Sequence, residues 1–552
     1  MKKFWSLNKG KFLLLLIILL GAVLRLYNLD WDQGTHIHPD ERFLTMVGGS
    51  MKLPATFSNY LNPDVSTFNP ANVGYRFFVY GIFPLSLNKS LALIFNNDTY
   101  NAFTIQGRFL SALADLLVIF FIYKTVGILE KRYKIDSSIK YFSSFLYSIF
   151  VLPIQLSHFF AVDTFLNLFV FATFFFSLNY WTKRRVIFVF LSGIFFGLAL
   201  ASKITGACVV LLVIPFLAFE KERPRIRFST FSLLHILLFL AASYLILRLT
   251  DPYIFTSSDI LSFTPSELFI KNLHELRALG AKNSFYPPNV QWISKIALLF
   301  TLKNLIIFGI GIPAFAFFLL GIFCSLKTKA KLIILGILAW MTAFLLYQGN
   351  QVAVPMRYFI LVYPFIAIIT AFGINYVFKR FGIIYLVLSL VFISIWGLMF
   401  FSIYTKPHSR ITASYWILRN VPQGGVILSE YWDDALPVFG GNYQSLQLPV
   451  FDSDTPEKWQ KMNNFLSQGD YLILSSNRGW GSIPTVPERY PQMTKFYKDL
   501  FDNKLSYKKI EEFTSYPSLS YLRIPLTLPD QWADESFTVY DHPKVVIFKN
   551  EE

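Results

Sequence analysis

The sequence predicts a polytopic α-helical membrane protein with about eleven transmembrane helices and a C-terminal soluble domain of α/β or α+β type. Of the 552 residues, 54% are hydrophobic and only 15% are charged, whereas soluble domains carry about 25% charged residues. Long apolar runs recur from residue 12 to residue 404 and then stop. We therefore expect a membrane domain over residues 1–404 and a soluble domain over residues 405–552.

The apolar runs define the predicted spans. Each is close to the length of about 20 residues that a helix needs to cross a bilayer. They lie near residues 12–29, 103–129, 141–157, 164–181, 186–202, 204–219, 229–249, 297–324, 332–347, 356–378 and 382–404. The apolar stretch 76–96 contains Gly81, Pro84 and Lys89, and we expect it to be interfacial or re-entrant.

Basic residues indicate the orientation of these spans. They precede the first span at residues 2–11 and then follow alternate spans, at 131–140, 183–185, 221–227, 327–331 and 379–380. All of them fall on one side, which the positive-inside rule identifies as the cytoplasm. The N-terminus is thus predicted to be cytoplasmic in the plasma membrane. The loops 30–102 and 250–296 and the C-terminal domain are predicted to be extracytoplasmic.

The net charge of +16 does not indicate a nucleic-acid partner. Residues 406–552 hold 15 basic and 18 acidic residues, a balance of −3, and the remainder holds 35 and 16, a balance of +19. The positive charge belongs to the membrane part, where topology explains it. The two cysteines, Cys208 and Cys324, lie in apolar runs and exclude a disulfide framework.

The alternation after residue 405 predicts the C-terminal domain. A helical pattern near Ile411–Leu418 is followed by the apolar runs 426–428, 471–474 and 545–548, with a second helical pattern at 487–502. Short apolar runs between helical patterns are typical of a small α/β or α+β domain.

The first external loop contains two adjacent carboxylates, Asp40 and Glu41, between His38 and Arg42. A carboxylate can remove the proton of a hydroxyl that attacks a sugar. The alternative is that Pro39 starts a short helix and the acids stabilise its N-terminus. Both interpretations remain open from these residues alone.

Further ionisable residues are predicted at the same face of the membrane. They are Arg108, His158, Asp163, Lys203, Asp251 and Arg357, with Tyr358 beside the last. Charges near hydrocarbon are costly and usually face a cavity or a partner. Each cation could instead extend to the interface, and His38 and His158 could be structural. Together, three cations and three carboxylates predict an anionic site suited to a lipid phosphate.

In this order and topology, the motifs resemble the GT-C superfamily of membrane glycosyltransferases. The similarity is to the protein O-mannosyltransferase and aminoarabinose transferase type, in glycosyltransferase family 39, and especially to bacterial and archaeal members. The motifs that carry it are His38–Arg42, Gly107–Leu113, Phe160–Asp163, Gly197–Lys203, Arg357–Tyr358 and Phe537–Val545.

The resemblance implies transfer of a hexose or pentose from a polyprenyl-phosphate donor at the outer face, with inversion at the anomeric carbon. It implies Asp40 as catalytic base and Glu41 as its catalytic neighbour. Arg108, Lys203, Arg357 and Tyr358 would lie at the donor phosphate, supported by His38, Arg42, His158 and Asp163. In some branches the acid at the position of Asp163 binds a metal, so a divalent ion such as Mg²⁺ or Mn²⁺ is a possible cofactor. The acceptor stays open between protein, lipid and glycan.

Two other classes compete with the glycosyltransferase. One is a lipid or solute transporter or flippase, although such proteins usually place their polar sites near the bilayer midplane. The other is a non-catalytic cell-envelope binding protein whose working part is the C-terminal domain. Membrane lipids are expected partners in every case.

Overall fold

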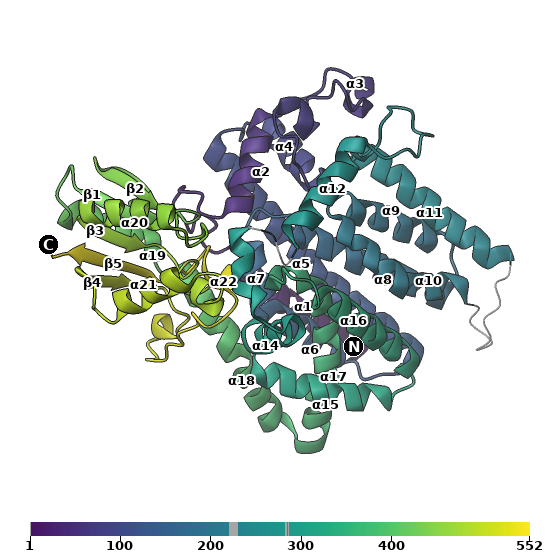
Figure 1. The fold of residues 1–552 in the computed structure, drawn as a ribbon. Coiled ribbons are helices and arrows are strands. Elements are labelled where there is room, and N and C mark those ends of the chain that lie inside the picture. The colour runs from purple at the N-terminus through teal and green to yellow at the C-terminus, as the bar shows by residue number, and fades with distance from the viewer. Residues whose placement is uncertain (1, 220–229, 282–283, 285, 552) are drawn as a thin grey trace.

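The computed structural model describes residues 2–219, 230–281, 284 and 286–551. Figure 1 shows a body of helices with a sheet domain, in green and yellow, against one side. The helical body runs from α1 (Lys2–Leu26) to α18 (Ile383–Phe401). The basic residues at 221–227 that entered the topology prediction lie outside the described residues.

Between α1 and α18 the body contains long and short helices. The longer ones are α2 (Pro39–Ser50), α4 (Phe83–Phe95), α5 (Tyr100–Tyr133), α6 (Ile139–Ile149), α8 (Asp163–Lys183), α9 (Ile187–Leu200), α11 (Thr230–Thr250), α12 (Glu267–Leu279), α15 (Ile312–Leu326), α16 (Lys331–Gln348) and α17 (Tyr363–Phe381). The shorter ones are α3 (Phe57–Leu61), η1 (Pro70–Val73), α7 (Val151–Ser157), η2 (Ile204–Val209), α10 (Val210–Ala218), η3 (Pro252–Ile254), η4 (Pro287–Asn289), α13 (Val290–Ile293), α14 (Ala297–Asn304), η5 (Leu305–Ile310) and η6 (Met356–Val362). The short helix η7 (Ser402–Thr405) follows α18.

The chain is a polytopic integral membrane protein, as predicted, but its spans are less regular than the apolar runs suggest. Among the described residues, six helices are long and apolar enough to cross a membrane, or up to eight if each of two bent helix pairs forms one span. The bent pairs are Ile139–Ile149 with Val151–Ser157, at 56°, and Pro287–Ile293 with Ala297–Ile310, at 97°. The run at 297–324 is interrupted at Gly311, whose φ of +85° ends one helical segment before α15 begins.

Small residues bring the helices close together. A Cβ at Gly193 or at Gly197 of α9 would lie 2.6 Å from a backbone oxygen of α11, that of Phe239 or of Ser243. Such close backbone approach is what a GxxxG pattern allows in membrane helices. The GxxxG at residues 193–197 therefore serves helix packing.

The C-terminal domain is built on one mixed sheet. Its strands are β1 (Val426–Glu430), β2 (Gln444–Leu448), β3 (Tyr471–Leu474), β4 (Tyr507–Phe513) and β5 (Val545–Asn550), in the order β2-β1-β3-β5-β4. The first three strands are parallel, and β5 runs antiparallel to both β3 and β4. The helices are α19 (Ser409–Asn420), α20 (Pro456–Gln468), η8 (Ile483–Thr485), α21 (Pro491–Phe501), η9 (Ser520–Leu522) and α22 (Glu535–Thr538). The expected α/β character is present.

A buried charge cluster joins this domain to the helical body. The two ring nitrogens of His542 lie 2.5 Å from Asp541 and 2.9 Å from Asp530. Asp541 also accepts hydrogen bonds from Gln155 of α7, at 3.0 Å, and from Tyr404 of η7, at 2.9 Å. Burial favours a neutral imidazole, but the two carboxylates outweigh it and raise the pKa of His542 to about 10.

The contact between the C-terminal domain and the helical body is expected to lose stability at alkaline pH. A raised histidine pKa contributes stability that is complete below the unfolded value of about 6.5 and is lost as the pH rises through about 10. We expect the thermal midpoint of the purified protein to fall over this range. The variant His542→Gln should start from a lower midpoint at neutral pH and show a shallower decline. Parallel curves for the two proteins would contradict the assignment.

Candidate functional site

The two adjacent acids begin helix α2. Pro39 occupies its first position, and Nδ1 of the N-cap residue His38 accepts a hydrogen bond from the Glu41 amide at 3.3 Å. The acids are therefore in the first turn, as the capping interpretation requires. Successive helical residues point about 100° apart, so Asp40 and Glu41 face different surroundings.

Glu41 faces a closed interior. Its carboxylate accepts hydrogen bonds from Arg108, through Nε at 2.8 Å, and from the Phe160 amide at 2.7 Å. Arg108 also donates to both oxygens of Asp32, at 3.0 and 2.7 Å, and to the Leu29 carbonyl at 2.6 Å. With the bond from Nη2 to Glu41, all five N–H groups of this guanidinium are used.

This arrangement bears on two predicted roles. The side chains of Arg108 and Glu41 are 1% and 0% exposed. Because every donor of Arg108 is engaged inside the protein, none is left for a donor phosphate. These contacts of Arg108 and Glu41 hold the first external loop on α5. The phosphate-binding and catalytic roles expected from the sequence stay predictions.

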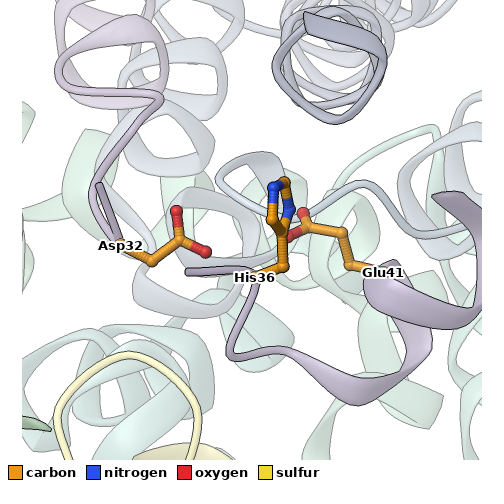
Figure 2. Close-up of side chains that lie close together, drawn as sticks. All are labelled: Asp32, His36 and Glu41. Carbon is orange, nitrogen blue, oxygen red and sulfur yellow. The ribbon is translucent and has the colours of Figure 1, made fainter. Parts of the chain in front are cut away.

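Figure 2 shows Asp32, His36 and Glu41, the group of possible metal ligands found among the described residues. One ligand atom from each lies within 4.8 Å of the others, and Nδ1 of His36 is buried without a hydrogen-bond partner there. However, the Arg108 guanidinium already binds both carboxylates. A divalent cation would be repelled by this guanidinium, so the donor set does not fit a metal.

Asp40 faces a different part of the structure, at the start of η6. It forms an ion pair with Arg357, and the two side chains are 24% and 21% exposed. Burial opposes ionisation of Asp40, but Arg357, His38 and Lys203 outweigh it and hold its pKa at about 2. Asp40 is thus an accessible carboxylate with a cation beside it.

A second ion pair lies next to the first. Lys203 Nζ is 2.9 Å from Asp163 and 4.4 Å from the ring centroid of Tyr358. Arg357 lies 5.8 Å from the same ring. The structure thus brings Asp40, Asp163, Lys203, Arg357 and Tyr358 together from four distant parts of the chain. Asp163 pairs with a lysine here and belongs to no group of three possible metal ligands among the described residues.

The two predicted histidines, His38 and His158, have different surroundings. His38 and Arg357 line a small cavity of about 10 Å³ with Tyr540 and Ser536 of the C-terminal domain. The His158 ring stacks on Tyr404 at 3.6 Å, and its nitrogens lie 2.8 and 3.1 Å from backbone oxygens, which is a structural role. Asp251 is likewise structural, because it accepts the Ile82 amide at 3.1 Å.

Arg42 connects the loop to the C-terminal domain. It donates to Asp434 at 3.0 Å, and the buried Arg410 donates to the other oxygen of Asp434 at 2.7 Å. Arg410 also binds Asp433 at 2.6 Å. The turn after β1 therefore holds the N-terminal part of α2, and with it Asp40, against the sheet domain.

Two tyrosines near Asp40, Tyr80 and Tyr286, were not predicted from the sequence. Burial, followed by the negative charge of Asp40, raises the pKa of both Tyr80 and Tyr286. Tyr286 also meets Trp432 of the sheet domain edge to face, with ring centroids 5.9 Å apart. No local pattern in the sequence marks these residues, because their proximity to Asp40 arises only from the tertiary fold.

The comparisons with known proteins bear on the enzyme class and the fold. Residues 91–247 match the family model of the dolichyl-phosphate-mannose-protein mannosyltransferases, so this segment is similar to that family. The matched residues include Arg108, Asp163 and Lys203. The expected enzyme class is confirmed, namely a membrane glycosyltransferase that uses a polyprenyl-phosphate-linked sugar.

Solved structures of two proteins are similar to this chain, and the first of the two shares its fold. One is the Archaeoglobus fulgidus oligosaccharyltransferase tethered with an acceptor peptide, with 14% identity, a TM-score of 0.50, and coverage of 100% of this chain and 89% of that one. The same enzyme in complex with Zn and sulfate also has 14% identity and a TM-score of 0.50, with coverage of 93% and 74%. ArnT from Cupriavidus metallidurans bound to undecaprenyl phosphate is 11% identical, with a TM-score of 0.46 and coverage of 98% of both chains. Among curated proteins, no relative matches the chain.

Proposed function

We propose that this protein transfers a sugar from a polyprenyl-phosphate donor to an acceptor hydroxyl, with Asp40 as general base and inversion at the anomeric carbon. The observation that carries this proposal is the accessible Asp40–Arg357 pair beside Lys203 and Asp163. It supplies a proton acceptor and two cations at one point. A protein, a lipid or a glycan could provide the hydroxyl.

The two cations are suited to the phosphate of the donor. Arg357 and Lys203 each have a carboxylate partner in the free protein and are partly exposed. A donor phosphate would compete with Asp40 for Arg357 and be held by charge-assisted hydrogen bonds. As the phosphate accumulates charge on leaving, the same cations would stabilise it more strongly than in the ground state.

The chemical step follows from this exchange of partners. The acceptor oxygen attacks the anomeric carbon, the bond from that carbon to the phosphate oxygen breaks, and polyprenyl phosphate leaves. Asp40 takes the hydroxyl proton and later returns it to solvent. Attack on the face opposite the phosphate inverts the anomeric configuration.

The distribution of basic residues supports an extracytoplasmic location for this reaction. The positive-inside rule predicts a cytoplasmic N-terminus, which would put loop 30–102, loop 250–296 and the domain at 405–552 outside. The membrane domain at 1–404 would hold the lipid-linked donor. The C-terminal domain would bound the acceptor side, since Tyr540 and Ser536 line the cavity beside Arg357.

Turnover of defined donors tests this proposal. Purified full-length protein in lipid nanodiscs is incubated with a panel of polyprenyl-phosphate sugars and with hydroxyl acceptors of each class. We expect saturable release of polyprenyl phosphate and a glycosylated product with inverted anomeric configuration. Absence of both donor binding and release across the panel would contradict the proposal and favour a non-catalytic binding protein.

Replacing Lys203 should weaken donor binding. Hydrogen bonds to charged groups contribute about 1.5–3 kcal/mol, so Lys203→Ala should raise the KM for the donor by about 10- to 100-fold. Lys203→Arg should retain most of the affinity. Lys495→Ala, at an exposed lysine of α21, is the matched control. An unchanged KM in Lys203→Ala would exclude the lysine from the phosphate site.

The pH profile should report the change of partner at Asp40. In the free protein its pKa is held at about 2, chiefly by Arg357 with His38 and Lys203. A bound phosphate that takes up Arg357 removes part of this stabilisation of the carboxylate, so the pKa should be higher in the donor complex. We expect the acid limb of kcat at a higher pH than that of kcat/KM, since the two report the bound and free enzyme. Coincident limbs would argue against the exchange.

A further inference from the structure

One segment of the C-terminal domain presents an unusual number of apolar side chains to its surroundings. This segment, here called the 517–532 loop, runs from Pro517 to Trp532 between β4 and α22. Its exposed apolar residues are Tyr521 at 36%, Leu522 at 49%, Ile524 at 46%, Leu526 at 43%, Leu528 at 39% and Trp532 at 50%. Single exposed apolar residues are common on proteins, but a contiguous group marks an interaction surface.

The backbone of this loop satisfies its own hydrogen bonds. The amides of Leu519 and Leu526 donate to Leu526 and Ile524 carbonyls at 2.9 and 2.8 Å, and Leu528 donates to Pro517 at 2.9 Å. Ser518 and Thr527 form an antiparallel bridge at its base. A segment closed in this way can leave water with little cost from its backbone, while its apolar side chains point outward.

The loop lies against a membrane helix. The Ser518 amide donates to the Met399 carbonyl at 3.1 Å, and the Tyr521 hydroxyl donates to the Leu398 carbonyl at 3.1 Å. Both acceptors are in the last turn of α18. Figure 1 shows this yellow part of the chain beside α18 and below the sheet.

The exposed face of α18 continues the same surface. Its outward residues Val387, Leu388, Val391 and Phe392 are 50–61% exposed, in a helix that is long and apolar enough to span the bilayer. Side chains exposed on such a helix face lipid. The loop is therefore bound to the end of a helix whose preceding turns expose apolar side chains.

Basic side chains flank the loop. Lys406 Nζ donates to the Tyr516 carbonyl and Lys303 Nζ to the Trp532 carbonyl, each at 3.0 Å. Arg523 is exposed at the tip. Tyrosine and tryptophan with flanking lysine and arginine are typical of the zone between water and hydrocarbon.

We propose that the 517–532 loop is a membrane-surface anchor, which inserts its apolar side chains into the interface of the leaflet on the side of the C-terminal domain. Its partner is the lipid itself, with acyl chains against Leu522, Ile524 and Leu526 and headgroup phosphates near Arg523. The anchor fixes the height of the sheet domain above the bilayer. This inference is independent of the proposed sugar transfer.

Quenching by lipid tests the anchor in the full chain. Single cysteines replace Leu526, Val391 or Ser467 in a background with Cys208→Ser and Cys324→Ser, and each is labelled with an environment-sensitive fluorophore. Val391 is on the exposed face of α18, and Ser467 is an exposed residue of α20. The proteins are placed in phosphatidylcholine nanodiscs that contain a lipid with a quenching nitroxide near the headgroup.

We expect the label at Leu526→Cys to be quenched at least about twofold more than the label at Ser467→Cys, with the label at Val391→Cys as a reference for a lipid-facing position within the span. It should also be less accessible to aqueous iodide than the Ser467 label. Equal lipid quenching at Leu526 and Ser467 would overturn the proposal. So would protection from both quenchers, because it would indicate a second copy of the chain or another protein on the loop. Ile524→Cys provides a second position if labelling at Leu526 disturbs folding, which elution as a single species checks.

Discussion

Replacement of Asp40 by asparagine is expected to lower the rate of sugar transfer by about 10²- to 10⁴-fold, the usual contribution of a general base. The amide keeps the shape of the side chain but cannot accept the hydroxyl proton. Donor affinity should not fall, because Arg357 loses its competing carboxylate and becomes free for the phosphate. The variant is compared with the wild type by two measurements. One is the rate of polyprenyl phosphate release at saturating donor concentration, and the other is the affinity for the donor.

The fold should tolerate this change, since Asp40 is partly exposed and its partner is an equally accessible arginine. Asp64→Asn, at an exposed acid of the same external loop, is the matched control for the loss of one negative charge. Wild-type turnover in Asp40→Asn would remove Asp40 from the reaction. Loss of turnover accompanied by loss of donor binding would instead indicate a binding role.

Much of the architecture could be predicted from the sequence, because long apolar runs in a membrane almost always form helices. What it could not provide was the course of the helices. Residues 141–157 and 297–324 read as single runs, but the chain bends at Phe150 and turns at Gly311. Composition alone does not distinguish a straight span from a broken one, because both bury the same apolar side chains.

The sequence indicated which residues could belong to the candidate site, but it did not indicate which of them contact each other. The motif around Asp40 and Glu41 indicated paired acids, and in the structure Arg357 pairs with Asp40 while Lys203 pairs with Asp163. Which acid pairs with Arg357 depends on the rotation of α2, and this is set by His38, Arg108 and the sheet domain. Contacts across several hundred residues, such as Arg42 with Asp434, leave no local pattern.

Replacement of Arg108 by alanine is expected to cause a larger loss of stability than any other single change discussed above. Removing one partner of a buried ion pair costs about 3–5 kcal/mol. Here the loss would leave two carboxylates, of Asp32 and Glu41, facing each other in a closed interior. Thermal or denaturant unfolding of the purified protein in detergent measures the effect, and Arg108→Lys should recover only part of it because an ammonium has three donors in place of five.

Two comparisons separate this structural role from a phosphate-binding role. Lys203→Ala removes a cation from a partly exposed pair, so it should lower donor affinity while changing the unfolding midpoint little. Glu41→Gln should lower the midpoint, because the amide cannot match the charge of Arg108, yet the folded fraction should keep its kcat. If Arg108→Ala instead unfolds like the wild type and binds the donor weakly, the guanidinium must reach the phosphate. The five internal hydrogen bonds of Arg108 would then have to break when the donor enters, and the first external loop would have to move with them.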